Sequence, residues 1–167
     1  MPHHHHRSSV AISASIALLT VSDTRTAETD SSGAALRRAL EAAGHRVADQ
    51  CILPDEPDRV RGLVSDWLDR DDVDVVLVNG GTGISRRDRT HEVVAGLLDQ
   101  RLAGFGELFR MLSYQQIGSA AMLSRAVGGI ARGKPLFSLP GSTAAVELAI
   151  ERLILPELAH LLAELRK

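Results

Sequence analysis

Short apolar runs alternate along this chain with segments that carry an amphipathic helix pattern. The apolar runs predict β-strands at residues 16–21, 46–53, 75–78 and 136–139. The helix patterns lie between and after them, at residues 30–43, from residue 57, at residues 90–100 and after the turn at residues 140–142. Since strands that alternate with helices form parallel sheets, we expect a three-layer αβα sandwich, with helices on both faces of a mostly parallel sheet.

Three of these segments carry a further signal. The sequence VVLV at residues 75–78 is a continuous β-branched and leucine run, which is typical of a strand buried on both faces. Polar and apolar residues alternate at residues 46–53, which favours a strand near an edge. Pro156 must kink or split the last helix.

The chain of 167 residues is long enough for one compact domain, to which we assign residues 10–167. Residues 1–9 contain four consecutive histidines and are interpreted as a tag-like or disordered N-terminus outside the fold. No apolar run is long enough to span a membrane. Cys51 is the single cysteine, so an intramolecular disulfide is impossible. This fits a reducing compartment, and we expect a cytoplasmic protein.

The charge balance excludes some classes of partner. The formal net charge is −2, and no basic tract stands out, so neither nucleic acid nor an anionic membrane is expected as the main partner. A phosphorylated small molecule remains open, because backbone amides and helix N-termini bind anions without a net positive charge.

Polar and glycine-rich residues are concentrated directly after the predicted strands. The four stretches are TVSDTRT, LPDEPD, NGGTGISRRD and LPGST. In α/β sheets, ligands bind outside the carboxyl ends of the strands. These four stretches therefore predict one ligand site built from four loops.

The third stretch is a glycine loop that fits no common nucleotide fingerprint. It has no lysine for a Walker A motif, and Arg86 stands where the last glycine of Gly-x-Gly-x-x-Gly should be. Its glycines still allow the backbone to turn sharply and approach a ligand, and Thr90 is expected to cap the next helix. We favour phosphate or nucleotide contact over a plain strand-to-helix turn. The residues concerned are Gly80, Gly81, Thr82 and Gly83.

Two aspartates are candidate magnesium ligands. Asp55 and Asp88 lie on loops at the same edge of the predicted sheet. Mg²⁺ at phosphate sites is usually held by one or two carboxylates together with water and phosphate oxygens, so these two side chains could share one ion. For Asp55, the alternative is a purely structural role at a helix start.

The first and last of the four loops supply further candidate binding residues. In the first loop, Asp30 or a nearby serine is expected to be the N-cap of a helix whose free amides could bind an anion. The candidates are Ser22, Asp23, Asp30, Ser32 and Gly33 in the first loop and Gly141 and Ser142 in the last.

Several other polar residues carry weaker signals. Arg125 could contact phosphate or another subunit, and the two alternatives stay open. Glu107 and Arg110 have the spacing of a surface ion pair on a helix. The three histidines His45, His91 and His160 are expected to be exposed, and Cys51 is expected to face the core.

Four ordered motifs resemble the MoaB/MogA family of molybdenum-cofactor biosynthesis proteins, and MoaB most. They are LLTVSDTRTAETDSSG, VLVNGGTGISRRDRTHEVV, GFGELFRMLSYQQIGSAAMLSRAVGGI and LFSLPGSTAAVELAI. The resemblance covers nearly the whole chain. It implies a molybdopterin-binding fold.

The resemblance also implies an activity. Active family members adenylylate molybdopterin with Mg·ATP, which gives adenylyl-molybdopterin and pyrophosphate. The family's catalytic aspartates match Asp55 and Asp88. Ser142 and Thr143 replace an amide-proline pair of the adenylylating branch, so a non-catalytic molybdopterin-binding accessory protein stays open as the alternative. The family further implies a homotrimer or homohexamer and a hand-over to the metal-insertion protein of the pathway.

Overall fold

The computed structural model describes residues 12–167, so the interpretation of residues 1–9 lies outside the described residues. The strands are β1 (Ser15–Val21), β2 (Arg46–Leu53), β3 (Val75–Asn79), β4 (Gln100–Arg101), β5 (Val127–Ala131) and β6 (Lys134–Leu139). The α-helices are α1 (Ser31–Ala42), α2 (Pro57–Asp69), α3 (Thr90–Leu97), α4 (Ala103–Ile117), α5 (Thr143–Ala149) and α6 (Leu155–Leu165). A 3₁₀ helix, η1 (Gly118–Leu123), follows α4, and a π-helical turn, η2 (Ile150–Ile154), joins α5 to α6.

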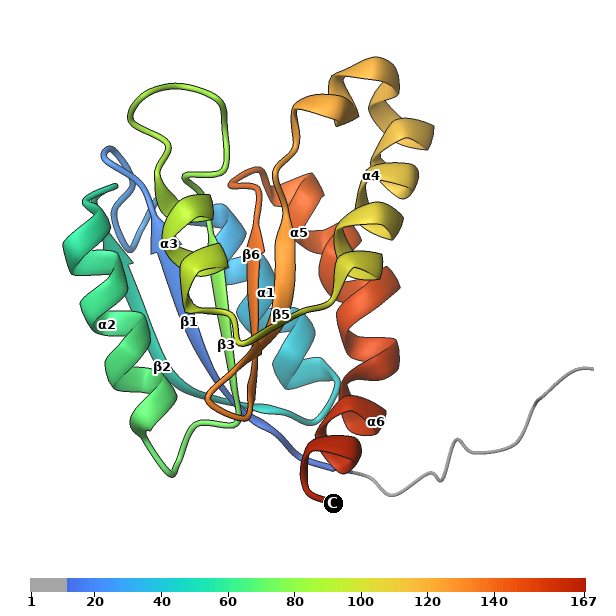
Figure 1. The fold of residues 1–167 in the computed structure, drawn as a ribbon. Coiled ribbons are helices and arrows are strands. Elements are labelled where there is room, and N and C mark those ends of the chain that lie inside the picture. The colour runs from blue at the N-terminus through green and yellow to red at the C-terminus, as the bar shows by residue number, and fades with distance from the viewer. Residues whose placement is uncertain (1–11) are drawn as a thin grey trace, which may run out of the picture.

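The six strands form one mixed sheet in the order β2-β1-β3-β6-β5-β4 (Figure 1). β1 pairs in parallel with β2 and β3, and β3 pairs in parallel with β6. Only β5 runs against its neighbours, since it is antiparallel to both β6 and β4. The expected mostly parallel sheet is confirmed, and β2 is an edge strand as its alternating pattern predicts.

Helices cover both faces of the sheet, which confirms the predicted three layers (Figure 1). On one face α1, α4, α5 and α6 enclose a core that includes Leu18, Leu77 and Phe109. On the other face α2, with its buried Trp67 ring, and α3 pack over Leu19 and Val76. Because every residue of β3 is buried, the VVLV run is a strand covered on both faces, as expected.

The structure corrects some expected boundaries. The helix expected at residues 90–100 ends at Leu97, and the short strand β4 follows it. Thr90 is not the N-cap of α3, because it lies inside the helix and its buried hydroxyl has no hydrogen-bond partner. Pro156 does divide the last helix: it lies in the first turn of α6, directly after the π-helical turn.

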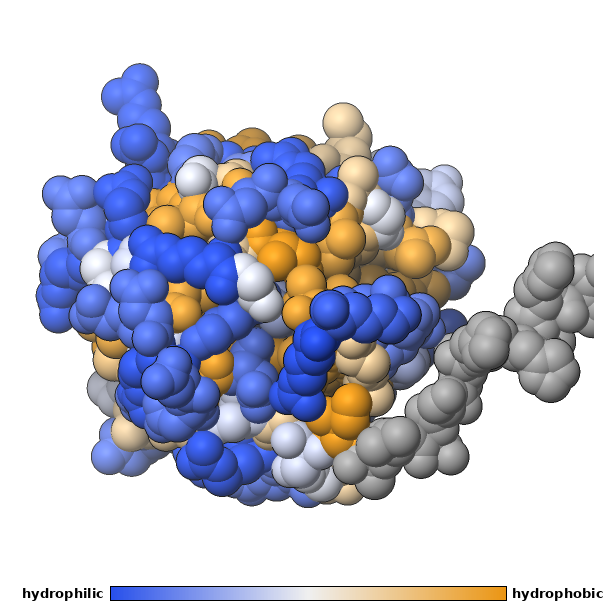
Figure 2. All heavy atoms as spheres, turned by 60° about the horizontal axis from the view of Figure 1, so that its bottom comes forward, coloured by the Kyte–Doolittle hydropathy of each residue, from blue (hydrophilic) through white to orange (hydrophobic). Residues whose placement is uncertain are grey.

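The two ends of the sheet differ in the loops and side chains that surround them. The carboxyl ends of the parallel strands meet the long loops and the end of α4 (Figure 1). At the opposite end, hydrophilic residues cover most of the surface, and hydrophobic residues show in smaller areas between them (Figure 2). Among residues 12–167, no helix is both long and apolar enough to cross a bilayer.

Candidate active site at the carboxyl edge of the sheet

A cleft of about 690 Å³ lies where the loops after β1, β2, β3 and β6 meet. The rule that ligands bind at the carboxyl ends of strands predicts this place. Most of the candidates selected from the sequence line the cleft: Ser22, Asp23, Asp55, Gly80, Gly81, Thr82, Gly83, Asp88, Gly141 and Ser142.

Close backbone approaches explain why glycines occupy this edge. Gly80 has a φ of +97°, and a Cβ atom there would lie 2.1 Å from the carbonyl oxygen of Val21. A Cβ atom at Gly141 would lie 3.2 Å from the Cα atom of Gly80. The ends of β1, β3 and β6 are therefore packed closely, backbone to backbone, and a larger residue at Gly80 would clash with the end of β1.

Asp55 is buried beneath the glycine loop, with 5% of its surface exposed. Its carboxylate accepts the backbone N–H of Arg89 at 3.2 and 3.3 Å. Burial is the main cause that raises the pKa of Asp55 above its usual value, and the nearby charges of Asp88 and Asp23 add to it. A carboxylate in this setting is favoured in its charged form when a cation is close.

Asp88 lies at the far end of the same loop and is half-buried. It accepts a short hydrogen bond from the Ser85 hydroxyl, and its carboxylate faces Gly83, where a Cβ atom would lie 2.8 Å from Oδ2. Within residues 12–167, histidine, cysteine and acidic side chains form no group of three or more that could hold a metal ion. A metal at this edge would therefore need ligands beyond the two aspartates, such as water or substrate oxygens.

Asp23 and Arg87 close one side of the cleft. Arg87 donates to the Asp23 carboxylate through Nε and Nη2 at 2.8 and 2.9 Å, and Asp23 also accepts the backbone N–H of Asp55 at 3.0 Å. The hydrogen bonds from Arg87 are the main cause that lowers the pKa of Asp23 to about 2. This bidentate pair joins the first loop to the glycine loop.

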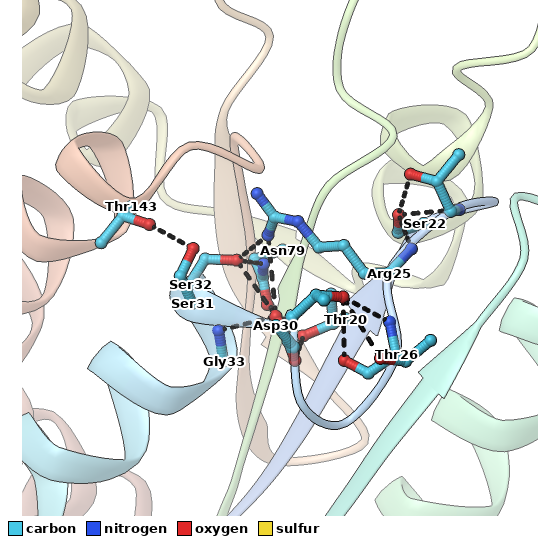
Figure 3. Close-up of polar contacts among 12 residues, drawn as sticks. Thr20, Ser22, Arg25, Thr26, Asp30, Ser31, Ser32, Gly33, Asn79 and Thr143 are labelled. Carbon is cyan, nitrogen blue, oxygen red and sulfur yellow. Dashed lines mark hydrogen bonds and ion pairs between the residues drawn. The ribbon is translucent and has the colours of Figure 1, made fainter.

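A buried polar network lies behind the first loop (Figure 3). The Thr20 hydroxyl contacts the Asp30 carboxylate at 2.7 Å and the Asn79 side chain at 3.1 Å. Asn79 in turn donates to the Ser32 hydroxyl at 2.8 Å. Arg25 donates a short hydrogen bond to the same hydroxyl, and it lines the cleft. The network therefore connects the strand ends to a cleft arginine.

Asp30 is the N-cap of α1, as predicted, and accepts the backbone N–H of Gly33 at 3.0 Å. Asp30, Ser32 and Gly33 are buried and lie behind the residues that line the cleft. Ser22 lines the cleft, and its hydroxyl accepts the backbone N–H of Arg25 at 3.1 Å. In the last loop, Ser142 caps α5 through the N–H of Ala145 at 3.2 Å.

The opposite wall of the cleft was not expected from the sequence. It consists of α4, η1 and the residue after them: Phe109, Ser113, Ile117, Ala120, Leu123 and Ser124. The motif GFGELFRMLSYQQIG is amphipathic, and this signal does not distinguish a core face from a cleft face. Arg25 and Arg87 were also missed, although both lie in loops that the strand-end rule selects.

The weaker candidates have mixed outcomes. Arg110 does not pair with Glu107 as expected; it donates to the Ala126 carbonyl at 3.2 Å. His160 is exposed as expected. His45, in contrast, is half-buried and accepts the backbone N–H of Ala14 at 3.1 Å, and burial lowers its pKa. His91 is also half-buried, against its expected exposure, and contacts the backbone of Arg125.

Two other outcomes concern Arg125 and Cys51. The Arg125 guanidinium contacts backbone carbonyls of the glycine loop and the carboxylate of Glu92, and it lies outside the lining of the large cleft. Cys51 is half-buried and packs against the core under α2 and α3, as expected.

Comparisons with known proteins agree with this architecture. The family model of the probable molybdopterin binding domain matches residues 17–160. Molybdenum cofactor biosynthesis protein B of Bacillus cereus is 53% identical over 151 residues, which cover 90% of this chain and 89% of that protein. The corresponding protein of Halalkalibacterium halodurans is 51% identical with the same coverage.

Solved structures give the same result. A crystal structure of molybdenum cofactor biosynthesis protein B superposes with a TM-score of 0.91 at 51% identity, and covers 93% of this chain and 98% of that chain. The tungsten cofactor synthesizing protein MoaB from Pyrococcus furiosus has a TM-score of 0.83 at 36% identity, with the same coverage. The chain therefore belongs to the MoaB/MogA family of molybdenum-cofactor biosynthesis proteins and resembles its MoaB members most strongly.

Proposed function

We propose that this chain binds molybdopterin in the cleft and adenylylates it with Mg·ATP. The observation that carries the proposal is the convergence of Asp55, Asp88 and the glycine loop on one cleft of about 690 Å³. A cleft of this size holds a small molecule, and its mixed lining suits a ligand with both phosphate groups and a planar ring.

The residues present fit a magnesium ion. Asp55 and Asp88 offer carboxylate oxygens, which Mg²⁺ prefers, and their mutual repulsion would be relieved by a cation. The buried hydroxyl of Thr90, which lacks a partner in the structure, faces Gly81 on the same side as the Asp55 carboxylate. The ion held by these residues would neutralise charge on the phosphate oxygens of the nucleotide.

In the proposed reaction, a terminal phosphate oxygen of molybdopterin attacks the α-phosphorus of ATP. The bond between this phosphorus and the oxygen that bridges to the β-phosphorus breaks, and pyrophosphate leaves. Backbone amides of the loop at Gly80, Gly81 and Gly83 would donate to the phosphate oxygens, and catalysis would consist mainly of positioning and electrostatic stabilisation. The apolar wall at Phe109 and Leu123 would hold a ring and limit the access of water.

The test is incubation of the purified protein with molybdopterin and Mg·ATP, with pyrophosphate release as the readout. Asp88→Asn is expected to keep molybdopterin binding and to lose nucleotide transfer, because the amide keeps the shape but not the charge. Asp58→Asn is the matched control, since Asp58 is an exposed acid of α2 outside the cleft. Near-normal transfer by Asp88→Asn would refute the metal-binding role. Molybdopterin binding without pyrophosphate release by the wild-type protein would favour the non-catalytic accessory protein.

We further propose that the protein assembles as a homotrimer or homohexamer and passes its product to the metal-insertion protein of the pathway. Support for self-association comes from large apolar side chains that are exposed along α4, including Leu108 (47%), Met111 (51%) and Tyr114 (63%). Sedimentation velocity measures the assembly directly, and a purely monomeric protein at micromolar concentration would contradict the proposal.

A further inference from the structure

Arg125, which lies outside the lining of the cleft, forms several hydrogen bonds with the backbone of the glycine loop. The Arg125 side chain donates from Nε to the carbonyl of Thr82 at 3.2 Å and from Nη2 to the carbonyl of Asp88 at 2.9 Å. Nη2 also donates to the carbonyl of Gly83. One planar guanidinium therefore contacts both the beginning and the end of the loop, in the fixed geometry that an arginine fork provides.

The arginine is itself held in place from α3. Its Nη1 forms an ion pair with the carboxylate of Glu92, and only 27% of the Arg125 side chain is exposed. The backbone carbonyl of Arg125 contacts Nδ1 of His91, which must carry the proton because a carbonyl only accepts. The guanidinium is thus tied to the same helix that follows the loop.

Because a peptide unit is planar, a hydrogen bond to its carbonyl also fixes the direction of its N–H group. In a trans peptide, the C=O of one residue and the N–H of the next point in opposite directions. Because Arg125 binds the carbonyl of Thr82, the N–H of Gly83 points away from the guanidinium. Gly83 lines the cleft and Arg125 does not, so the arginine fixes the orientation of a peptide unit at the cleft from outside the cleft lining.

The same reasoning connects Arg125 to the buried aspartate. Arg125 binds the carbonyl of Asp88, and the N–H of the same peptide unit, that of Arg89, donates to Asp55. This single peptide is held at both ends, with an arginine on one side and a carboxylate on the other. The backbone of Asp88 is therefore fixed relative to Asp55.

We propose that Arg125 is a positioning residue for nucleotide transfer, which sets the glycine-loop amides and the spacing of Asp55 and Asp88 without contacting substrate. This inference rests on the proposed adenylylation. It predicts that Arg125 contributes to the rate of transfer more than to the affinity for molybdopterin. A misplacement of about 1 Å at such a loop lowers a rate by about 100-fold.

Arg125→Met, which removes every guanidinium contact, is the first test. We expect kcat for pyrophosphate release to fall about 100-fold, while the Kd for molybdopterin changes by less than about threefold. Arg86→Met is the matched control, since Arg86 is an exposed arginine in the same loop and lies outside the cleft lining. A kcat of Arg125→Met within about threefold of wild type would overturn the proposal.

Two further variants separate positioning from charge or general stability. Arg125→Lys keeps the positive charge beside Glu92 but cannot reach both ends of the loop, so its kcat should stay near that of Arg125→Met. Recovery of wild-type kcat in Arg125→Lys would show a purely electrostatic role and overturn the proposal. Millimolar guanidinium should partly restore kcat in Arg125→Ala, which a variant that is merely unstable would not show.

Amide hydrogen exchange tests, without any substrate, whether Arg125 holds the backbone of the glycine loop. In Arg125→Met, a peptide covering residues 80–91 should exchange about tenfold faster than in wild type, with unchanged exchange in β1 and β3. Unchanged exchange in residues 80–91 would show that the hydrogen bonds of Arg125 do not hold the loop, and would overturn the proposal. The two proposals fail differently: if wild type releases no pyrophosphate, the adenylylation is wrong, whereas an active wild type matched by Arg125→Met makes only the positioning role wrong.

Discussion

Removal of the Asp30 carboxylate tests the buried network behind the cleft. Asp30→Ala removes the N-cap that accepts from Gly33, which costs about 1 kcal/mol. It also removes the buried carboxylate that the Thr20 hydroxyl contacts at 2.7 Å, and hydrogen bonds to charged groups contribute about 2 kcal/mol. Arg25 loses a carboxylate 3.6 Å away. We expect the free energy of unfolding to fall by about 3 kcal/mol.

Urea denaturation at pH 7 measures this loss, with an unchanged m-value as evidence that the same unfolding transition is compared. Ser142→Ala is the matched control, because Ser142 caps α5 with an exposed side chain, and its loss should cost only about 1 kcal/mol. Asp30→Asn separates the cap from the charge, since asparagine also caps helices. If Asp30→Ala is no more destabilised than Ser142→Ala, the network does not stabilise the fold as argued.

Three further outcomes follow from the same geometry. Asp55→Asn should raise Tm at pH 7, because burial disfavours the charged carboxylate of the wild-type protein. Since the pKa of Asp55 is raised in the folded state, the wild-type carboxyl becomes neutral as the pH falls through that pKa, and the gain in Tm should then disappear. Gly80→Ala should destabilise the fold by more than about 2 kcal/mol in urea, because the methyl group would meet the carbonyl of Val21 at a positive φ. Arg87→Met should raise the pKa of Asp23 from about 2 toward its ordinary value, which an NMR titration of the carboxyl carbon measures.

Local sequence patterns predicted the parallel part of the sheet, because β1, β3 and β6 contain short apolar runs and β2 alternates polar with apolar residues. They did not predict β5, whose sequence VGGIA contains two glycines that weaken a strand pattern. The structure shows why both positions, 128 and 129, are glycines. A Cβ atom at Gly128 would lie 2.3 Å from the Phe137 ring, and one at Gly129 would lie 2.1 Å from the carbonyl of Gln100. These requirements come from neighbouring strands, so no local pattern contains them.

The site was predictable to a similar extent. The strand-end rule selected the loops that meet at the cleft, since it depends only on the order of strands and helices. The wall at Phe109 could not be predicted, because a helix face that lines a cleft has the same periodicity as one that faces a core. The hydrogen bond from Arg125 to the Thr82 carbonyl joins residues that are 43 positions apart, and a single sequence contains no signal for such a contact.

The position of β6 between β3 and β5 has a consequence for synthesis on the ribosome. β1, β2 and β3 can pair as soon as Asn79 has emerged, but β3 then presents an open edge until Lys134–Leu139 follows. An unpaired apolar strand edge is a template for wrong pairing with other chains. The nascent chain should therefore be prone to aggregation from the emergence of Asn79 until β6 has emerged and paired with β3.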